Sequence, residues 1–389
     1  MSARSNESGS APPPDAPLRI VHVVRNLGEH QGGPSVSVPR LALATAGLGH
    51  PATVLATGAA LPPRLPAGLD ARVFPGTGPE VLGASVGLAS ALRRLQPDVV
   101  HSHGLWRRTL HYGARQARRG SAIHVVSPRG MMAPWAWAHH RRRKTAARWL
   151  LHPGALESAD GWHATSALEA EEIRALGFTQ PICVAPNGVD EPDTTEAQAA
   201  ASYWRSACPA TGHRRTAVFY SRFHAKKRLV ELIDLWLVVA PADWLLLLVG
   251  LPETYSVADL ESYIGRHPAR DRIVIFDGTG RPPPYAVAQL FLLPSHSENF
   301  GLVIADALAH GVPVLVTDTT PWPEVVAAHA GWCVPWSDYE STLRRVLALS
   351  PEALAAHGVA AKAWVIPRFS WGHSATLLVD FYRQLRSAP

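Results

Sequence analysis

The sequence predicts an α/β protein of two Rossmann-like domains that face each other across a cleft. The chain has 389 residues, which is more than one ordinary hydrophobic core organises. Short apolar runs alternate with amphipathic stretches, a pattern typical of parallel sheets with crossover helices. This alternation stops after residue 190 and resumes near residue 215, so we expect two such units in succession.

The first unit follows a polar, proline-rich segment. Residues 1–17 lack the apolar core of a secretory signal, and we expect them to form a disordered leader. Apolar runs then predict buried strands, beginning with LRIVHVVRN at residues 18–26. Residues 18–190 are therefore predicted to form the N-terminal Rossmann-like domain.

A polar stretch separates this unit from the second. Residues 191–214 mix charged and small side chains and are predicted to be the inter-domain segment. Strand-like runs return with TAVFYSR at residues 216–222, and residues 215–365 are predicted to form the C-terminal Rossmann-like domain. Residues 366–389 contain a terminal amphipathic helix, which we expect to pack back on the N-terminal domain.

Composition excludes several classes of protein. Apolar residues make up 47% of the chain, yet no run is long enough to predict a membrane-spanning helix. The three cysteines are far apart and show no metal-ligand spacing, so we expect reduced thiols and a cytoplasmic protein. The net charge of +6 is not arranged as a continuous basic track, so no nucleic-acid partner is expected.

The most informative stretch lies between two predicted strands of the second unit. A strand ends at Pro294, a polar loop follows, and Gly301 opens a helix. A helix that starts after a strand presents free backbone N–H groups, which suit a phosphate. Glu298 in the loop and Asp306 in the helix cannot neutralise a phosphate, so we expect them to bind hydroxyl groups.

Two cations are expected at the same edge of the sheet. Arg222 and Lys227 flank the turn that follows another predicted strand. Arginine offers a planar fork and lysine a compact charge, and each charge-assisted contact contributes about 1.5–3 kcal/mol. Together they suit a diphosphate whose negative charge grows as its bond to a sugar breaks. The alternative is a solvated basic face, with Glu298 serving only as a helix cap.

These residues together resemble glycosyltransferase family 4, the retaining GT-B enzymes that use nucleotide sugars. Glu298 matches the first acid of the family motif, and Asp306 stands where a second Glu is usual. The family's basic pair falls on Arg222 and Lys227, although Ser221 and Arg228 replace the usual flanking glycines. Residues 25–57 resemble the family's first strand, glycine loop and helix. Other segments resemble members that build bacterial polysaccharides: residues 101–106, 127–136, 163–166, 185–190 and 319–325.

The resemblance implies a retaining transfer of a hexose-type sugar from a nucleotide diphosphate donor to a glycan or lipid-linked acceptor. The acceptor would lie in the N-terminal domain and the donor in the C-terminal domain. The expected catalytic residues are Glu298, Arg222, Lys227, Arg129 and His103. The expected donor-binding residues are Gly32, Gly33, Asn299, Phe300, Gly301, Leu302 and Asp306. No cofactor and no metal are expected, because the cations and helix N-termini would stabilise the leaving group.

Some of these interpretations keep alternatives. Arg129 stands where many members carry a histidine, and it could instead be a structural ion-pair partner. His103 could be a packed residue. The whole protein could instead be a non-catalytic sugar-nucleotide-binding protein, or a GT-B nucleotide-sugar epimerase that needs no acceptor.

A second surface is predicted in the N-terminal domain. Trp135 and Trp137 precede a basic run from Arg141 to Lys144. On a helix, residues 135–149 would place aromatic anchors beside a cationic face, which suits an anionic membrane surface. We therefore expect a protein that can lie at the inner face of a membrane, or alternatively an ordinary solvated helix.

Overall fold

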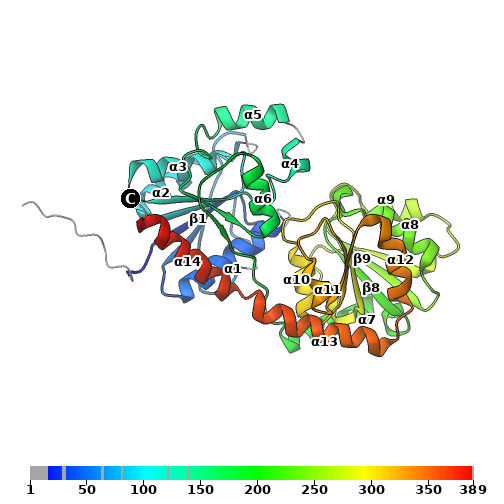
Figure 1. Cartoon of the computed structure of the whole chain (residues 1–389). Helices are drawn as coiled ribbons and strands as arrows, with labels where there is room; N and C mark the ends of the chain where they lie inside the picture. Colours follow the sequence, from blue (N-terminus) through cyan, green and yellow to red (C-terminus); the bar gives the residue numbers. More distant parts are fainter. Residues whose placement is uncertain are drawn as a thin grey trace, which may run out of the picture.

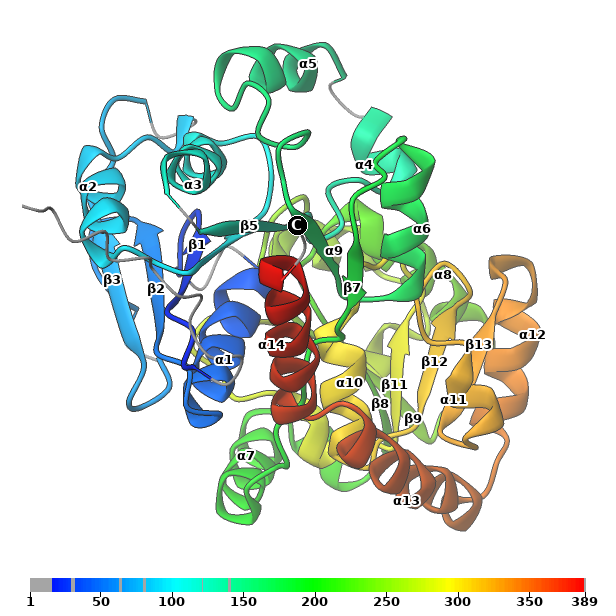
Figure 2. The same cartoon turned by 60° about the vertical axis from the view of Figure 1, so that its left-hand side comes forward.

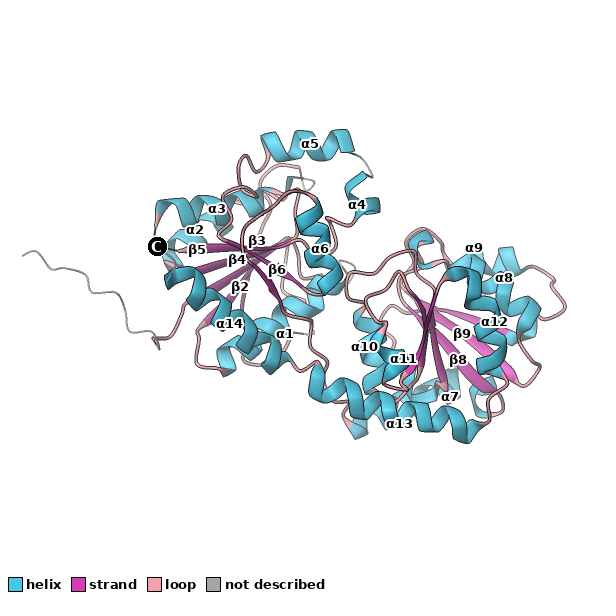
Figure 3. Cartoon of the chain, viewed as in Figure 1, coloured by secondary structure: helices cyan, strands magenta, loops and turns pink. Residues whose placement is uncertain are grey.

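The computed structural model describes residues 16–28, 32–62, 65–79, 82–120, 122–138 and 141–387. Within these residues the chain forms two parallel sheets flanked by helices (Figures 1 and 3). The two α/β units that the sequence predicts are confirmed. Most of the leader, residues 1–15, lies outside the described part of the chain.

The N-terminal sheet has seven described strands in the order β3-β2-β1-β4-β5-β6-β7. Its inner strands are buried on both faces because helices cover each side, which explains their continuous apolar runs. The strands are β1 (Ile20–Val24), β2 (Ala52–Thr57), β3 (Asp70–Phe74), β4 (Val99–His103), β5 (Ile123–Ser127), β6 (Gly161–Ala164) and β7 (Ile182–Val184). The helices are α1 (Gly33–Gly47), α2 (Val86–Leu95), α3 (Arg108–Arg119), α4 (Pro134–Ala138), α5 (Arg141–Leu150) and α6 (Ala167–Ala175).

The C-terminal sheet has six described strands in the order β10-β9-β8-β11-β12-β13. The strands are β8 (Arg215–Tyr220), β9 (Trp244–Gly250), β10 (Ile273–Asp277), β11 (Leu290–Leu293), β12 (Val314–Thr317) and β13 (Gly331–Val334). The helices include α8 (Leu229–Val239), α9 (Val257–Ile264), α10 (Leu302–Ala309), α11 (Glu324–Ala327) and α12 (Trp336–Leu347). The strand order of this sheet reverses direction between β8 and β11. Ligands of such sheets bind at the point where the strand order reverses.

The segment expected between the domains forms helix α7 (Thr194–Ala207). Asp193 caps it by accepting hydrogen bonds from the backbone N–H groups of Thr195 and Glu196. Trp204 is fully buried in the core of the C-terminal domain and donates to the carbonyl of Pro282 at 3.1 Å. The helix therefore packs as part of that domain.

The last two helices cross back between the domains. Helix α13 (Pro351–Arg368) runs along the C-terminal domain, and α14 (Trp371–Ser387) lies against α1 (Figures 1 and 2). At the crossing, the N–H of Val189 donates to the carbonyl of Phe369 at 2.6 Å, so both inter-domain connections lie side by side. The expected return of the terminal helix is confirmed. None of the described helices combines the length and apolarity needed to cross a bilayer.

Candidate active site

The loop after β11 ends in a helix N-terminus that no side chain caps. Gly301 adopts a φ of 77°, and a Cβ there would lie 2.8 Å from the Cδ1 of Ile304, so a larger residue is disfavoured. Helix α10 starts at the next residue. Its first backbone N–H groups therefore face the edge of the sheet, where they suit an anion.

Beside this N-terminus lies a buried ion pair. The ammonium group of Lys227 contacts the Oε1 of Glu298, and the two side chains are 9% and 10% exposed. Ser295 donates a second hydrogen bond to the same oxygen at 2.6 Å. Burial raises the pKa of Glu298, but the charge of Lys227 and the two hydrogen bonds outweigh it and hold the pKa below its ordinary value.

Arg222 lies farther out on the same edge. It forms a two-oxygen ion pair with Glu253, at 2.7 and 3.0 Å, and both side chains are 41% exposed. Its guanidinium also reaches the N-terminal domain, because a Cβ added to Gly32 would lie 3.9 Å from its Nε. Arg222 and Lys227 therefore share the edge occupied by α10, as the sequence suggests.

The glycine loop of the N-terminal domain lies opposite these residues. Gly32 has a φ of 78° and precedes α1, whose N-terminus has no side-chain cap. A Cβ on Gly33 would lie 3.6 Å from the Cδ1 of Leu302 in α10. Two uncapped helix N-termini, one from each domain, thus lie on the facing surfaces.

Asn299 joins the two domains. Its side-chain amide donates to the Oγ1 of Thr165 at 2.8 Å, and its carbonyl accepts from Ser166 at 3.2 Å. Gly130 packs against it so closely that a Cβ would lie 2.8 Å from the Cβ of Asn299. Its Oδ1 is buried and has no partner among the described residues. Asn299 is therefore an inter-domain contact whose Oδ1 is buried without a donor among the described residues.

The side chains of Phe300 and Leu302 point into apolar surroundings. Phe300 is 4% exposed and packs on Trp322 and Phe369, with ring centres 5.2 and 5.9 Å apart. Leu302 packs against the apolar clusters of both domains. Because the ring of Phe300 completes the core, only its backbone can face a ligand, and its donor-binding role stays a prediction.

Asp306 lies on the face of α10 turned toward the N-terminal domain. Its charged neighbours are Arg40 and Asp190, which form an ion pair with each other at 2.7 Å. Burial raises the pKa of Asp306 to about 7, with Asp190 adding to this effect and Arg40 opposing it. The carboxyl is therefore poised to change charge near neutral pH.

Arg129 follows β5 and turns back toward a row of buried histidines. Its Nη2 and Nε lie 3.0 and 3.3 Å from the Nδ1 of His103, and its Nη1 donates to Asn187 at 2.8 Å. The Nε2 of His103 lies 3.0 Å from the Nδ1 of His22. Because a guanidinium only donates, the Nδ1 of His103 accepts from Arg129, and the proton of the neutral His103 ring is on Nε2. This Nε2–H donates to the Nδ1 of His22, so the proton of His22 is on its own buried Nε2. His103 therefore orients Arg129, and both of its ring nitrogens are engaged by other side chains of the domain.

A second chain of hydrogen bonds lies beside the first. The hydroxyl of Tyr382 in α14 lies 2.7 Å from the Nδ1 of His101, and the Nε2 of His101 lies 3.2 Å from the Nδ1 of His163. The Nε2 of His163 in turn lies 2.8 Å from the carbonyl of Ala185. Burial, aided by Arg129, lowers the pKa of His163 to about 3, so the ring is neutral at physiological pH. A helix far along the sequence thus packs on this polar row through hydrogen bonds.

Nitrogens of three of these rings lie close enough to share a metal ion. Atoms of His22, His101 and His103 lie within 4.8 Å of one another. The hydrogen bonds described above already use both nitrogens of His101 and His103, and the cationic Arg129 adjoins them. The ring arrangement therefore fits a hydrogen-bonded network better than a metal site.

Sequence reasoning missed two carboxylates that organise the site. Glu253, the partner of Arg222, follows β9 in the segment LPETY, where an acid after a buried strand was the available signal. Glu169 is 1% exposed and accepts from the backbone of Gly130 and Thr165, both at 2.7 Å. Its signal was the spacing Ser-x-x-Glu that opens α6, typical of a helix start. It holds the loop of Arg129 against the domain interface.

Comparisons with known proteins identify the family of the chain. The sequence profile described as Glycosyltransferase Family 4 matches residues 31–191, and that of Glycosyl transferases group 1 matches residues 214–350. The chain is a family 4 glycosyltransferase. The glycosyltransferase is 26% identical over 318 residues to the alpha-maltose-1-phosphate synthase of Mycolicibacterium smegmatis, which covers 74% of this chain and 79% of that protein.

Two further relatives extend the comparison. The glycosyltransferase is 25% identical over 320 residues to the GDP-mannose:cellobiosyl-diphosphopolyprenol alpha-mannosyltransferase of Xanthomonas campestris, with 80% and 78% of the two chains covered. The Anabaena protein HepE, solved with UDP and glucose, superposes with a TM-score of 0.73 at 17% identity and covers 94% of this chain and 100% of its own. The fold of the glycosyltransferase is therefore GT-B.

Proposed function

We propose that this enzyme is a retaining glycosyltransferase that moves a hexose-type sugar from a nucleotide diphosphate to a glycan or lipid-linked acceptor in bacterial polysaccharide biosynthesis. The observation that carries the proposal is the convergence of Arg222, Lys227 and the uncapped start of α10 at one sheet edge. Gly32 faces them from the other domain. Cations and backbone N–H groups in this arrangement suit a diphosphate leaving group.

Each residue has a distinct role in this proposal. Lys227 and Arg222 stabilise the charge that develops on the departing diphosphate. Among the described residues, Lys227 and Ser295 both donate to the Oε1 of Glu298, so its Oε2 is available to accept a hydroxyl group of the donor sugar. Arg129, oriented by His103, faces the transferred sugar or the acceptor.

The relatives support the proposed substrates through their names. The Xanthomonas enzyme is named for GDP-mannose and for a diphosphate-linked lipid acceptor, and HepE was solved with UDP and glucose. A nucleotide diphosphate sugar and a phosphorylated acceptor are therefore the substrates to try first. The base, the sugar and the linkage follow from experiment.

A donor panel tests the proposal. UDP-, GDP- and ADP-sugars are mixed with the wild-type protein, and the true donor raises the melting temperature because it binds the folded state. Lys227→Met should reduce this shift, whereas Arg142→Met, an exposed change on α5, should keep it. NMR of the product then reports the anomeric configuration, and retention is expected. An inverted product, or isomerised donor formed without acceptor, contradicts the proposal.

The same assay tests whether a metal is needed. We propose that the two cations and two helix N-termini stabilise the diphosphate without an ion. Transfer measured after treatment with EDTA should equal transfer before it, and added magnesium should leave the rate unchanged. Loss of activity on chelation, restored by one divalent metal, contradicts this part of the proposal.

We also propose that α5 lies on an anionic membrane surface. Trp149 and Leu150 are 74% and 72% exposed, and Arg142 and Arg143 are exposed on the same helix. Trp137 packs on Trp106 instead of facing solvent, and the side chain of Trp135 lies outside the described residues, so Trp149 replaces these two as the anchor. The protein should float with vesicles that contain phosphatidylglycerol, and Trp149→Ser with Leu150→Ser should not. Equal flotation of both proteins contradicts it.

A further inference from the structure

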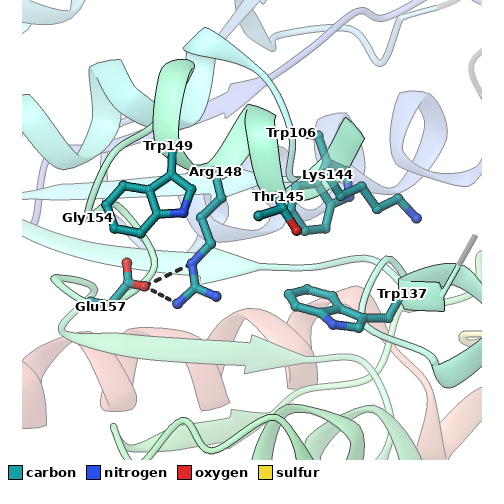
Figure 4. Close-up of a pocket in the computed structure, with 8 residues that line it drawn as sticks. All are labelled: Trp106, Trp137, Lys144, Thr145, Arg148, Trp149, Gly154 and Glu157. Atoms are coloured by element: carbon teal, nitrogen blue, oxygen red, sulfur yellow. Dashed lines mark hydrogen bonds and ion pairs between the residues drawn. The ribbon is translucent and has the colours of Figure 1, made fainter. Parts of the chain in front are cut away.

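A pocket of about 540 Å³ lies in the N-terminal domain beneath α5. Its volume falls in the range of sites that bind small ligands. It is lined by Trp106, Trp137, Lys144, Thr145, Arg148, Trp149, Gly154 and Glu157. Figure 4 shows Trp149 and Glu157 on one side and Trp137 on the other, with Arg148 between them.

The aromatic wall of the pocket is held in place by its backbone and its neighbours. Trp106 has a φ of 66°, which a bulky side chain rarely adopts and which costs about 1–3 kcal/mol. Its ring lies 5.2 Å from that of Trp137 and 5.9 Å from that of His152. Strain of this kind persists where surrounding structure enforces it, often at ligand sites. The indole is thus a fixed surface on which the C–H face of a sugar ring can stack.

The charge of the pocket comes from one lysine. Arg148 is neutralised by Glu157, which accepts from its Nε at 3.0 Å. Lys144 lies 5.8 Å from the centre of the Trp106 ring and donates to the carbonyl of Ala136, and no carboxylate among the described residues pairs with it. Burial lowers the pKa of Lys144, which shows that its ammonium group is partly withdrawn from water. An anionic ligand group would restore the balance of charge.

The pocket adjoins the candidate active site through two loops. The backbone N–H of Leu105 lies 3.1 Å from the sulfur of Met131, so the loop that carries Trp106 packs on the loop that carries Arg129. The second loop also contacts Asn299 of the other domain through Gly130. The loop that forms part of the aromatic wall of the pocket therefore packs on the loop that reaches the C-terminal edge of the sheet, where transfer is expected.

We propose that this pocket binds the phosphorylated saccharide head of the acceptor, with the sugar ring against Trp106 and Trp137 and the phosphate at Lys144. The inference rests on the proposed transfer to a glycan or lipid-linked acceptor, and it names the acceptor's chemical class. A neutral glycan lacks the charge that Lys144 recognises. Inorganic phosphate lacks the ring that the two indoles recognise.

The test labels the aromatic wall directly. The chain has 13 tryptophans, so the protein is made with 5-fluorotryptophan, and Trp106→Phe and Trp137→Phe assign the two ¹⁹F NMR signals. Glucose 1-phosphate, mannose 1-phosphate and a short-chain prenyl diphosphate disaccharide are titrated, with methyl glucoside and inorganic phosphate as controls. At least one phosphorylated saccharide should shift both signals, and the disaccharide arm distinguishes a lipid-linked source from a soluble sugar phosphate.

Matched variants complete the test. Lys144→Met should weaken this binding by about tenfold or more, because it removes a charge-assisted contact. Arg142→Met, on the same helix but outside the pocket, should bind as the wild type does. The inference is overturned if no phosphorylated saccharide shifts the signals, if inorganic phosphate shifts them equally, or if Lys144→Met binds normally.

The donor assay separates this inference from the proposed function. Lys144→Met should keep the melting-temperature shift with the nucleotide sugar and the slow hydrolysis of the donor by water, while losing transfer to the acceptor. If the donor still binds but no phosphorylated saccharide shifts the ¹⁹F signals of Trp106 and Trp137, only the pocket inference fails. If the wild type binds no nucleotide sugar, the proposed function fails, whatever the pocket titration gives.

Discussion

Removing the charge of Lys227 leaves the carboxylate of Glu298 buried with one hydrogen bond, from Ser295. Breaking one partner of a buried ion pair costs about 3–5 kcal/mol, because an uncompensated charge remains. For a domain of this size the melting temperature should fall by roughly 6–20 °C in Lys227→Met. Donor turnover should also fall by about 10- to 150-fold, the loss expected for one charge-assisted contact.

The pH dependence of this loss has a definite sign. In the wild type the pKa of Glu298 is below its ordinary value of 4.5, so its stabilising contribution is complete above pH 4.5 and is lost as the pH falls through the lowered pKa. In Lys227→Met, burial still raises the pKa of Glu298, but the lysine charge that lowered this pKa is gone. The pKa of Glu298 should therefore rise. The variant should therefore become more stable relative to wild type as the pH falls from 7 to 5.

A double variant separates the structural role from the chemical one. Lys227→Met with Glu298→Gln removes both charges, so at least half of the lost stability should return. Turnover should stay low, because neither the cation nor the carboxylate is present. Chemical denaturation followed by circular dichroism gives the stability, and release of nucleotide gives the turnover. The reasoning is refuted if Lys227→Met melts as the wild type does, or if the double variant regains turnover.

Three further predictions concern neighbouring carboxylates. Glu253→Gln should change the free energy of unfolding by less than about 1 kcal/mol, since the pair with Arg222 is exposed, and should tighten UDP binding in calorimetry by freeing that cation. Asp306→Asn should stabilise the protein more at pH 8 than at pH 4, because the cost of ionising this carboxyl in the folded state grows as the pH rises from its ordinary pKa of 3.8 to the raised value of about 7; equal gains at both pH values contradict this. Glu169→Gln should cost about 3 kcal/mol in denaturant melts, because it disturbs the hydrogen bonds that hold the loop of Arg129; unchanged stability excludes that role.

Local signals made much of the candidate active site predictable. Lys227, Glu298 and Gly301 lie in loops directly after buried strands, and parallel strands all end at the same edge of a sheet. Residues with this placement converge whatever the details of packing. Gly32 could be assigned in the same way, because it separates the first strand from its helix.

The partners of these residues were beyond such reasoning. Glu253 meets Arg222 from the next strand, and Glu169 reaches Gly130 across 39 positions of sequence. His103 reads equally well as a ligand contact or as a core residue, and only the bonds to Arg129 decide between them. Contacts of this kind depend on strand order and side-chain direction, which no local pattern encodes.

The sequence by itself determined the two parallel sheets, the strand-end loops and the cations and acids they carry, because burial and turn formation act over a few neighbouring residues. Tertiary structure alone decided that Asn299 joins the domains, that Phe300 completes a core, and that Trp106 and Lys144 enclose a pocket. These outcomes arise when surfaces distant in sequence are pressed together at close-packed density, so that each side chain's role is fixed by neighbours from other elements.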